Sequence, residues 1–186
     1  MMKHILLVDL CREKDSLSQY EFVDPIAATI ERSGYISQTM HFSDVTGEEM
    51  KNYDKIILCG TALKDDGYQE QLGLFSWIKR CEKPILGICA GMQVIGAVFG
   101  GKIVLQPAIG LKKMYIVKNS PLLGEAREIE GYHLHNYCVT LPDEFQLLAG
   151  LPRAVEAFRH ETRPIYGIIF HPEVRNRWIL DMFANL

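Results

Sequence analysis

Four short, mostly apolar runs in the first half of the chain constrain its fold more than any other feature of the sequence. Such runs are typical of strands that are buried on both faces of a parallel sheet. Helical patterns lie between them, and strands that alternate with helices favour a parallel sheet. We therefore expect an α/β protein with a mainly parallel central sheet that helices cover on both faces. The runs are HILLVD (residues 4–9), YISQTMHF (35–42), KIILCG (55–60) and PILGIC (84–89).

The segments between these runs carry helix signals. A first-turn proline begins PIAATIERS (residues 25–33), and Gly34 provides the stop that follows it. Thr46 and Glu49 are spaced as a capping box before a short helix. A stripe of large apolar side chains within residues 68–82 predicts a further helix.

The pattern changes after Gly101, where six short strand candidates are separated by proline and glycine turns. We expect some of them to form a smaller, partly antiparallel sheet, followed by a C-terminal helix near residues 175–183. The sequence shows no repeat, low-complexity tract or linker, so we interpret residues 1–186 as a single domain. The candidates are GKIVLQP (101–107), LKKMYIVK (111–118), YCVTLP (137–142), FQLLAGL (145–151), AVEAFRH (154–160) and PIYGIIF (164–170).

Composition and charge exclude several classes of partner. A net charge of -3 at pH 7, without a basic run, argues against nucleic acid, because phosphate binding needs a basic face. No apolar run reaches the roughly 18 residues of a membrane span, so we expect no membrane partner. The five cysteines are scattered and never in C-x-x-C spacing, which argues against a disulfide framework or a zinc site and predicts a reducing, cytoplasmic setting.

The stretch PILGICAGMQVIGAVFGG (residues 84–101) places Cys89 where a predicted strand turns into a predicted helix. Small residues surround it (Gly87, Ala90, Gly91), and they leave room for the tight turn that presents a nucleophile. The helix would aim free N–H groups and the positive end of its dipole at the sulfur, which favours the reactive thiolate. Taken alone, Cys89 is interpreted equally well as a small buried core residue.

A second signal lies far downstream, in FHPEV. His171 and Glu173 are two residues apart, so in an extended segment their side chains point to the same side. A histidine base needs a partner that fixes its tautomer, and a carboxylate serves that role. Since sites form where the carboxyl ends of strands meet, we expect this pair near Cys89. The N–H of Ala90 and one from the loop after Cys59 could both point at a developing oxyanion.

With these motifs the chain resembles the class I glutamine amidotransferases, whose glutaminase domains use a Cys–His–Glu triad. GICAGMQ matches the G-x-C-x-G-x-Q of the family, and YGIIFHPEV matches its G-x-x-F-H-P-E. FGGKI and LPDEFQLLA agree as well, so the resemblance covers most of residues 53–174. The C-terminal part looks most like the stand-alone amidotransferase subunit of archaeal-type GMP synthases. The resemblance implies a flavodoxin-like arrangement.

Carried over residue by residue, the resemblance implies specific roles. The implied oxyanion donors are the backbone N–H of Ala90 and one from the turn at Gly60 and Thr61, and Gln93 would lie beside the bound glutamine. No metal or organic cofactor is required for this half-reaction. The implied triad of nucleophile, base and orienting carboxylate consists of Cys89, His171 and Glu173.

Two segments depart from the family pattern. The family usually has S-G-G-P or N-G-P-G in its oxyanion loop, where this chain has CGTA, and Thr61 falls where the second glycine normally lies. A β-branched residue resists positive φ, so we expect this loop to rearrange before it works. GMP synthase subunits usually carry S-H-x-D, where this chain has LHNYCV, which is more similar to the H-S-Y segment of the imidazole-glycerol-phosphate synthase amidotransferase subunit. We count His135 and Asn136 of this segment among the candidate substrate-binding residues.

The expected function is hydrolysis of glutamine to glutamate and ammonia through a Cys thioester, with the ammonia passed to a separate synthase subunit of GMP synthase type. The sequence lacks G-x-x-x-x-G-K or another nucleotide motif, so a partner would have to activate the acceptor. Two alternatives stay open. One is a stand-alone hydrolase of γ-glutamyl amides or peptides, and the other is a catalytically silent binding subunit that has lost a competent oxyanion hole.

The other histidines and cysteines suggest no metal site. No carboxylate or cysteine falls at ligand spacing around His133, His135 and His160, so we expect surface or loop positions for them. Cys11 lies in a polar loop, where we expect it to be exposed.

Overall fold

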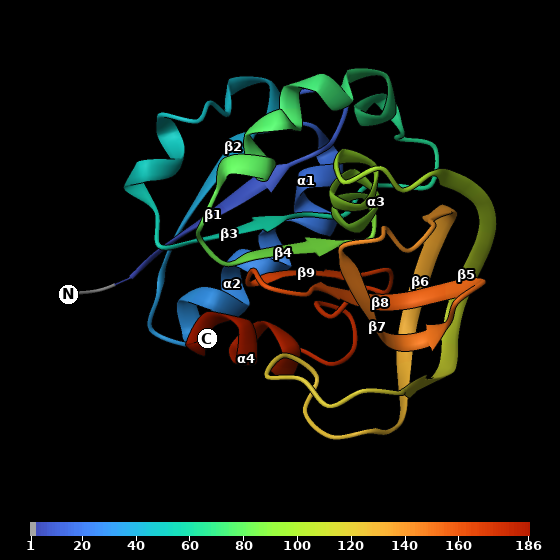
Figure 1. Ribbon diagram of the computed structural model, residues 1–186. Coiled ribbons are helices and arrows are strands. Elements are labelled where there is room, and N and C mark those ends of the chain that lie inside the picture. Colours follow the sequence, from blue (N-terminus) through green and yellow to red (C-terminus); the bar gives the residue numbers. More distant parts are fainter. Residues whose placement is uncertain (1–2) are drawn as a thin grey trace.

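The computed structural model describes residues 3–186, and its nine described strands form one sheet in the order β2-β1-β3-β4-β9-β8-β7-β5-β6 (Figure 1). The strands are β1 (His4–Asp9), β2 (Ile36–His41), β3 (Lys55–Leu58), β4 (Ile85–Ile88), β5 (Ile103–Ile116), β6 (Arg127–Val139), β7 (Phe145–Leu151), β8 (Ala154–His160) and β9 (Ile165–Ile168). The helical segments are α1 (Leu17–Phe22), α2 (Asp24–Arg32), η1 (Phe42–Asp44), η2 (Glu49–Asn52), η3 (Gly67–Arg80), α3 (Ala90–Val98) and α4 (Trp178–Asn185).

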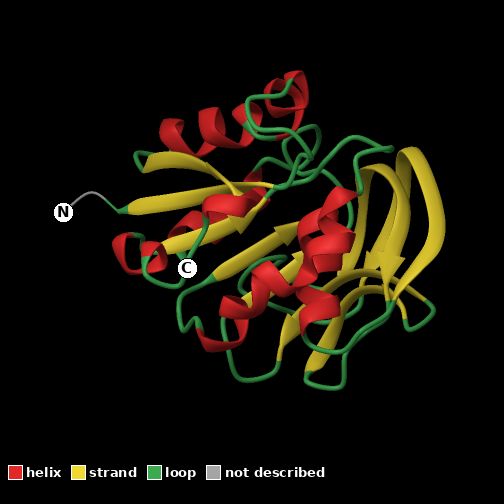
Figure 2. Cartoon of the chain, turned by 90° about the horizontal axis from the view of Figure 1, so that it is seen from above, coloured by secondary structure: helices red, strands yellow, loops and turns green. Residues whose placement is uncertain are grey.

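The first five strands in this order pair in parallel. Their order, β2-β1-β3-β4 followed by β9, is the flavodoxin-like one. β3, β4 and β9 are buried along their whole length, and helical segments lie on both sides of the sheet (Figure 2). The strand positions expected from the four apolar runs are therefore confirmed, and the carboxyl ends of β3, β4 and β9 lie next to one another.

The expectation of a separate, smaller sheet in the C-terminal half is wrong. β8 pairs antiparallel with β9, with Ala157 opposite Ile168, and the sheet continues from there into β7, β5 and β6. The reason is that β9 keeps one free edge after it pairs with β4, and an antiparallel hairpin fills that edge. In the described part of the chain, β5 and β7 pair at one position, Ile116 opposite Ala149.

Three further elements differ from the sequence-based expectation. β5 is one strand of 14 residues where two were expected, and its register against β6 shifts between Leu105 and Ala108. Pro107 lies in this shift and has no N–H to donate, so the ladder is interrupted without ending the strand. η3 is a 3-10 helix with a kink at Gln71, and α4 begins at Trp178, later than expected.

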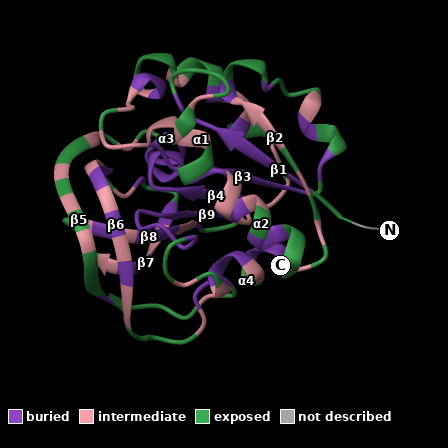
Figure 3. Cartoon of the chain, turned by 180° about the vertical axis from the view of Figure 1, so that it is seen from behind, coloured by how far each residue is buried: buried purple, intermediate pink, exposed green. Residues whose placement is uncertain are grey.

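Burial differs between the two halves of the sheet. Figure 3 shows that β1, β3, β4 and β9 of the parallel half are almost wholly buried, whereas the edge strand β2 is not, and burial alternates along β5 and β6. We call Ile109, Leu111 and Tyr115, which expose between 52% and 64% of their surface, the β5 outer face. Among residues 3–186, no helix has the length and apolar character that crossing a membrane requires.

Candidate active site

Cys89 lies at a strained turn between β4 and α3. Its backbone has φ 51° and ψ −104°, a region that residues with a side chain rarely adopt. The Cys89 N–H donates to the carbonyl of Ile168 on β9 at 2.8 Å, which holds the turn against the neighbouring strand. The side chain is 3% exposed. This geometry is that of a nucleophile elbow.

Close packing explains the glycines around the elbow. A Cβ atom on Gly91 would lie 2.2 Å from the carbonyl oxygen of Leu58, and one on Gly87 would lie 2.5 Å from the backbone of Gly91. Both distances are far below van der Waals contact, and the neighbouring atoms are backbone atoms that cannot turn aside. The small residues around Cys89 are therefore required because α3 packs so closely against β3 and β4.

The end of β9 supplies a buried His–Glu pair. His171 Nδ1 lies 2.7 Å from Glu173 Oε1, and both side chains are buried. His171 Nε2 is buried too and has no hydrogen-bond partner within residues 3–186. A Cβ atom on Gly60 would lie 2.6 Å from His171 Cε1 and 3.4 Å from Cys89 Cβ, so the glycine after β3 fits between the imidazole and the thiol-bearing residue.

The charges around His171 favour its protonated form. Burial acts to lower the pKa of His171, but the negative charges of Glu173 and Cys89 outweigh it, and the pKa lies well above its usual range. A protonated imidazole in this position is able to give its proton to a group that leaves beside it.

The loop after β3 lies opposite the elbow, and polar contacts hold it. Thr61 Oγ1 donates to the carbonyl of Asp65 at 2.8 Å, and the Asp65 carboxylate accepts from the N–H of Arg12 at 2.9 and 3.1 Å. Asn136 Nδ2 on β6 donates to the carbonyl of Leu63 at 2.9 Å. Thr61 is not among the described residues with positive φ, so its β-branched side chain is unstrained in this conformation.

Free backbone donors lie on both sides of this site. The N–H groups of Gly60 and Thr61 have no acceptor in the described chain, nor has the N–H of Ala90 at the start of α3. Unpaired N–H groups beside a nucleophile are what an oxyanion hole requires.

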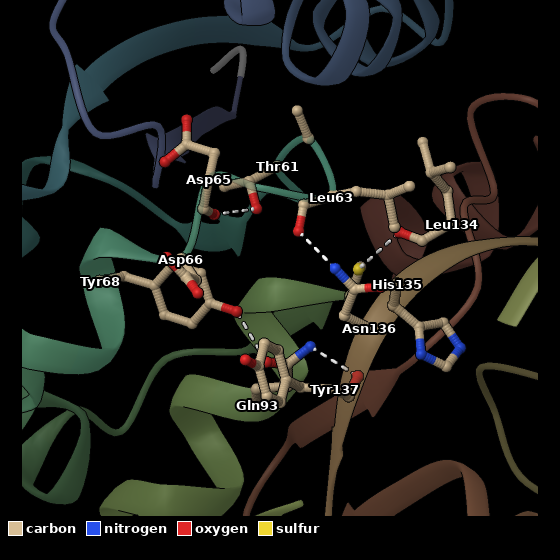
Figure 4. Close-up of a pocket in the computed structure, with 12 residues that line it drawn as sticks. Thr61, Leu63, Asp65, Asp66, Tyr68, Gln93, Leu134, His135, Asn136 and Tyr137 are labelled. Carbon is tan, nitrogen blue, oxygen red and sulfur yellow. Dashed lines mark hydrogen bonds between the residues drawn. The ribbon is translucent and has the colours of Figure 1, made fainter. Parts of the chain in front are cut away.

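A small pocket lies between the loop and β6 (Figure 4). Its walls include Thr61, Cys89, Gln93 and residues 134–137. The cavity volume is about 10 Å³, room for about one water molecule. Cys89 Sγ donates to the carbonyl of Leu134 at 3.6 Å, so the thiol is also engaged on the β6 side. In this conformation the pocket is closed to a molecule of the size of an amino acid.

Gln93 takes part in an internal network. Its Oε1 accepts from the Tyr68 hydroxyl at 2.6 Å, and its Nε2 donates to the carbonyl of Tyr137 at 2.9 Å. The side chain therefore joins η3, α3 and β6 on one side of the pocket. Tyr68 and the Leu134 carbonyl are site groups that the sequence did not point to. Tyr68 lies in the predicted helical stretch and carries no motif, and Leu134 contributes only its backbone.

The side chains of His135 and Asn136 point in different directions. Asn136 points at the loop, whereas the His135 ring points away from the other labelled side chains of the pocket (Figure 4). His135 is buried without a hydrogen-bond partner for either ring nitrogen in residues 3–186, and burial lowers its pKa to about 4. The expected surface or loop position is wrong for His135, and for His133 and His160, which are buried as well.

His133 has a carboxylate partner that sequence spacing did not show. Its Nε2 lies 2.7 Å from Glu156 on β8, a strand that is distant from β6 in sequence. The described residues contain no cluster of three or more potential metal ligands. The expectation that Cys11 is exposed is wrong: its side chain is buried, and its backbone N–H donates to the buried Asp9 carboxylate at 2.9 Å.

Known proteins resemble this chain in sequence. The profile of the family described as Glutamine amidotransferase class-I matches residues 18–179. A glutamine-hydrolyzing GMP synthase subunit of Thermoplasma acidophilum is 35% identical over 150 residues, which cover 77% of this chain and 75% of that protein. The corresponding GMP synthase subunit of Saccharolobus solfataricus is 33% identical over 135 residues, which cover 69% of this chain and 72% of that protein.

Solved structures show the same fold. A crystal structure described as that of a GMP synthase subunit from Thermoplasma acidophilum superimposes with a TM-score of 0.86 and 29% identity, covering 100% of this chain and 94% of that one. A glutamine amidotransferase from Thermotoga maritima superimposes with a TM-score of 0.71 and 18% identity, covering 96% of this chain and 82% of that one. The second likeness concerns the fold alone.

Proposed function

The chain belongs to the class-I glutamine amidotransferase family, and on that premise we propose that it hydrolyses glutamine and passes the ammonia to a separate synthase subunit of GMP synthase type. One observation carries the proposal: the ends of β3, β4 and β9 bring Gly60, Cys89 and His171 into contact distance in one buried site. Cys89 is the proposed nucleophile, His171 the acid and base, and Glu173 the group that orients the imidazole.

In the proposed reaction the Cys89 thiolate attacks the side-chain amide carbon of glutamine. The carbonyl oxygen becomes an oxyanion, which the free N–H groups of Ala90 and of the Gly60–Thr61 turn are placed to bind. Protonated His171 gives its proton to the amide nitrogen, the C–N bond breaks, and ammonia leaves behind a γ-glutamyl thioester. Neutral His171 then takes a proton from water, the water oxygen attacks the thioester, and glutamate leaves with the thiolate restored.

Glu173 supports both halves of this cycle. Its carboxylate accepts from His171 Nδ1, which leaves Nε2 to exchange the proton. Because the pKa of His171 lies well above its usual range, the imidazole starts the cycle protonated at neutral pH, as the departure of ammonia requires. Both carboxylate and imidazole are buried, so water does not compete for these bonds.

Glutamine binding needs a larger pocket than the closed one. The elbow cannot move far, since backbone atoms enclose it. The loop at residues 60–66 is held by hydrogen bonds, and within residues 3–186 its hydrogen bond to β6 comes from one side chain, Asn136. We therefore place the opening movement in the loop. The expectation that this loop rearranges before it works therefore stays a prediction.

We propose the β5 outer face as the surface that binds the synthase partner. Ile109 and Leu111 lie directly opposite Leu134 and Tyr132 on β6, and the Leu134 carbonyl contacts the Cys89 thiol. Exposed apolar surface of this kind marks interaction sites on soluble proteins. A partner bound there would cover β6, the strand that forms one wall of the pocket.

A glutaminase assay with and without a GMP synthase-type partner tests the proposal. We expect release of glutamate and ammonia in equal amounts, and covalent labelling of Cys89 by a diazo-ketone analogue of glutamine, read by peptide mass spectrometry. Cys89→Ala is the matched control and should show neither. If the wild-type chain releases no glutamate and takes no label even with the partner present, the proposal is wrong.

A catalytically silent binding subunit is the second candidate, and Thr61, which lies where the family pattern has a glycine of the oxyanion loop, favours it. It predicts that glutamine binds without turnover and that Cys89→Ala binds it as tightly as the wild type. The stand-alone γ-glutamyl peptide hydrolase of the sequence analysis finds less support, because its substrates are larger still. Turnover of such a peptide without any partner would favour it.

A further inference from the structure

A second and much larger pocket lies at the opposite end of the central strands. Its walls come from η2 and from the end of η3 with the residues that lead into β4. These are the segments at which β3 and β4 begin (Figure 1), whereas the Cys89 site lies where the same strands end. The cavity volume is about 810 Å³, within the roughly 300–1,000 Å³ of small-molecule sites.

Positive charge gathers around this pocket. Four cationic side chains line it against one carboxylate, that of Glu82, although the whole chain has a net charge of -3. Lys51 is paired with Glu48 at 2.7 Å. Lys79 and Arg80 are exposed and form no salt bridge within residues 3–186, so their charges are available to a ligand. The four cations are Lys51, Lys79, Arg80 and Lys83.

The ends of η2 and η3 at this pocket carry partial negative charge. This charge does not cancel that of the cations, because hydrogen-bond donors already occupy the terminal carbonyl groups. Lys83 Nζ donates to the carbonyls of Met50 and Lys51 at 2.7 and 3.0 Å, at the end of η2. The Arg163 guanidinium donates to the carbonyls of Ile78 and Lys79 at 3.0 Å, at the end of η3. The negative ends of both helical segments are thereby neutralised, which leaves a site that favours an anion.

The walls also include an aromatic ring. Trp77 lines the pocket and is partly buried, and Met50 adds a buried thioether side chain beside it. A flat indole wall next to unpaired cations suits a ligand that joins a planar ring to a negative charge. An inorganic anion would use the charges but leave the apolar wall and most of the volume empty.

We propose that this pocket binds a small molecule in which a planar aromatic ring carries a phosphate, a ligand of nucleoside phosphate type. The site is separate from the Cys89 pocket and does not depend on glutamine hydrolysis. η3 joins the two regions, since Tyr68 in its first turn donates to Gln93 and its last turn forms the wall of the second pocket.

The fluorescence of Trp77 provides a direct test. The chain has two tryptophans, so Trp178→Phe on α4 leaves Trp77 as the sole reporter. We expect adenosine monophosphate to change the emission of this variant with a saturable dependence on concentration. Adenosine, which lacks the charge, and inorganic phosphate, which lacks the ring, should each bind about tenfold more weakly or worse. Added salt should weaken the binding of the monophosphate.

Charge variants make the test specific to the site. Lys79→Ala with Arg80→Ala should weaken binding of the monophosphate by about tenfold. Lys112→Ala with Lys118→Ala removes two exposed lysines at β5 and just after it, and should leave binding unchanged. All four side chains are exposed, so thermal unfolding should show that both variants fold.

Three results would overturn the proposal: no saturable response of Trp77 to the monophosphate, equal binding of adenosine and the monophosphate, or equal losses in the two double variants. A response of Trp77 to a protein partner but not to the monophosphate would also overturn it and assign the pocket to an interface.

Discussion

The elbow at Cys89 and the loop at residues 60–66 form two walls of one pocket, but they are held in different ways. The elbow is fixed by backbone atoms in van der Waals contact and by a strained residue that its neighbours leave no room to relax. The loop is held to its surroundings by hydrogen bonds from Arg12 and Asn136. A further bond, from Thr61 to the Asp65 carbonyl, lies within the loop. Steric contacts resist any displacement, whereas each hydrogen bond contributes only about 1 kcal/mol and can be exchanged for one with water.

Under the proposed function, this difference separates the part of the site that would do the chemistry from the part that would admit the substrate. A nucleophile must be held in one geometry, and close packing against β3 and β4 provides that. A wall that opens must have a closed state of modest stability, and a few polar contacts provide that. The following changes test this contrast, in order of decreasing expected effect.

The largest effect should come from the elbow side chain. Cys89→Ala should reduce glutaminase activity by roughly 10⁴-fold or more, because the covalent route is lost. Thr61→Ala should reduce it by less than about tenfold, since the loop supplies backbone N–H groups and Thr61 Oγ1 only one hydrogen bond. Glutamate release measured for both variants checks this. Equal losses would mean that the loop side chain takes part in the chemistry.

The packing of the elbow can be broken without touching the nucleophile. Gly91→Ala should lower the free energy of unfolding by about 3 kcal/mol or prevent folding, because its Cβ would overlap the Leu58 carbonyl. Gly73→Ala on η3 is the matched control, as a Cβ there meets nothing within 4 Å. Urea unfolding of the two variants measures the difference. A Gly91 variant as stable as the control would show that the elbow can yield.

His135, the neighbour of Asn136 on β6, should lower the free energy of unfolding in acid. Its pKa is lowered to about 4 in the folded chain by burial, against about 6.5 when unfolded. The unfolded chain therefore takes up the proton first, and stability falls as pH falls from about 6.5 to 4, by up to about 3 kcal/mol. His135→Asn should remove this part of the slope in urea unfolding. Parallel pH profiles for the wild type and the variant would contradict it.

The smallest effect concerns the link between the loop and β6. Asn136→Ala removes the bond to the Leu63 carbonyl, which should destabilise the closed loop by about 1 kcal/mol. Alkylation of Cys89 should then be about fivefold faster, because each 1.4 kcal/mol corresponds to tenfold. Asn185→Ala, which removes a similar bond to the Asp181 carbonyl at the end of α4 and the bond from the Tyr35 hydroxyl, both away from the loop, should leave the rate unchanged. The alkylation rates of the two variants and the wild type are measured on the Cys89 peptide by mass spectrometry. Equal rates for all three would contradict the prediction.

The parallel strands could be predicted because each one is a local apolar run. The junction between the two halves of the sheet could not, since the pairing of β8 with β9 depends on an edge that only the folded sheet presents. The buried histidines did leave a signal. Along β6, burial alternates through Gly131, His133 and His135, which is the strand period, but their polar character suggested the surface.

The candidate site, too, could be predicted only where its signals are local in sequence. Cys89, His171 and Glu173 lie in motifs whose spacing is local, and the structure brings them together at adjoining strand ends. The contacts that close the pocket join residues far apart in sequence, as in the pair Leu63 and Asn136. No sequence pattern marks such a contact, because either partner is an ordinary residue until the fold brings them together.

The insertion of β9 between β4 and β8 also has a consequence for the order of events during synthesis. β4 and Cys89 leave the ribosome well before β9, and the whole antiparallel half of the sheet is made in between. Until β9 arrives, the Cys89 N–H lacks its acceptor on Ile168, and His171 has not yet been translated. Parallel pairing between such distant segments is slow. If Cys89 and His171 act as proposed, a growing chain therefore carries an inactive thiol, and the pair forms only when one of the last strands closes the gap in the sheet.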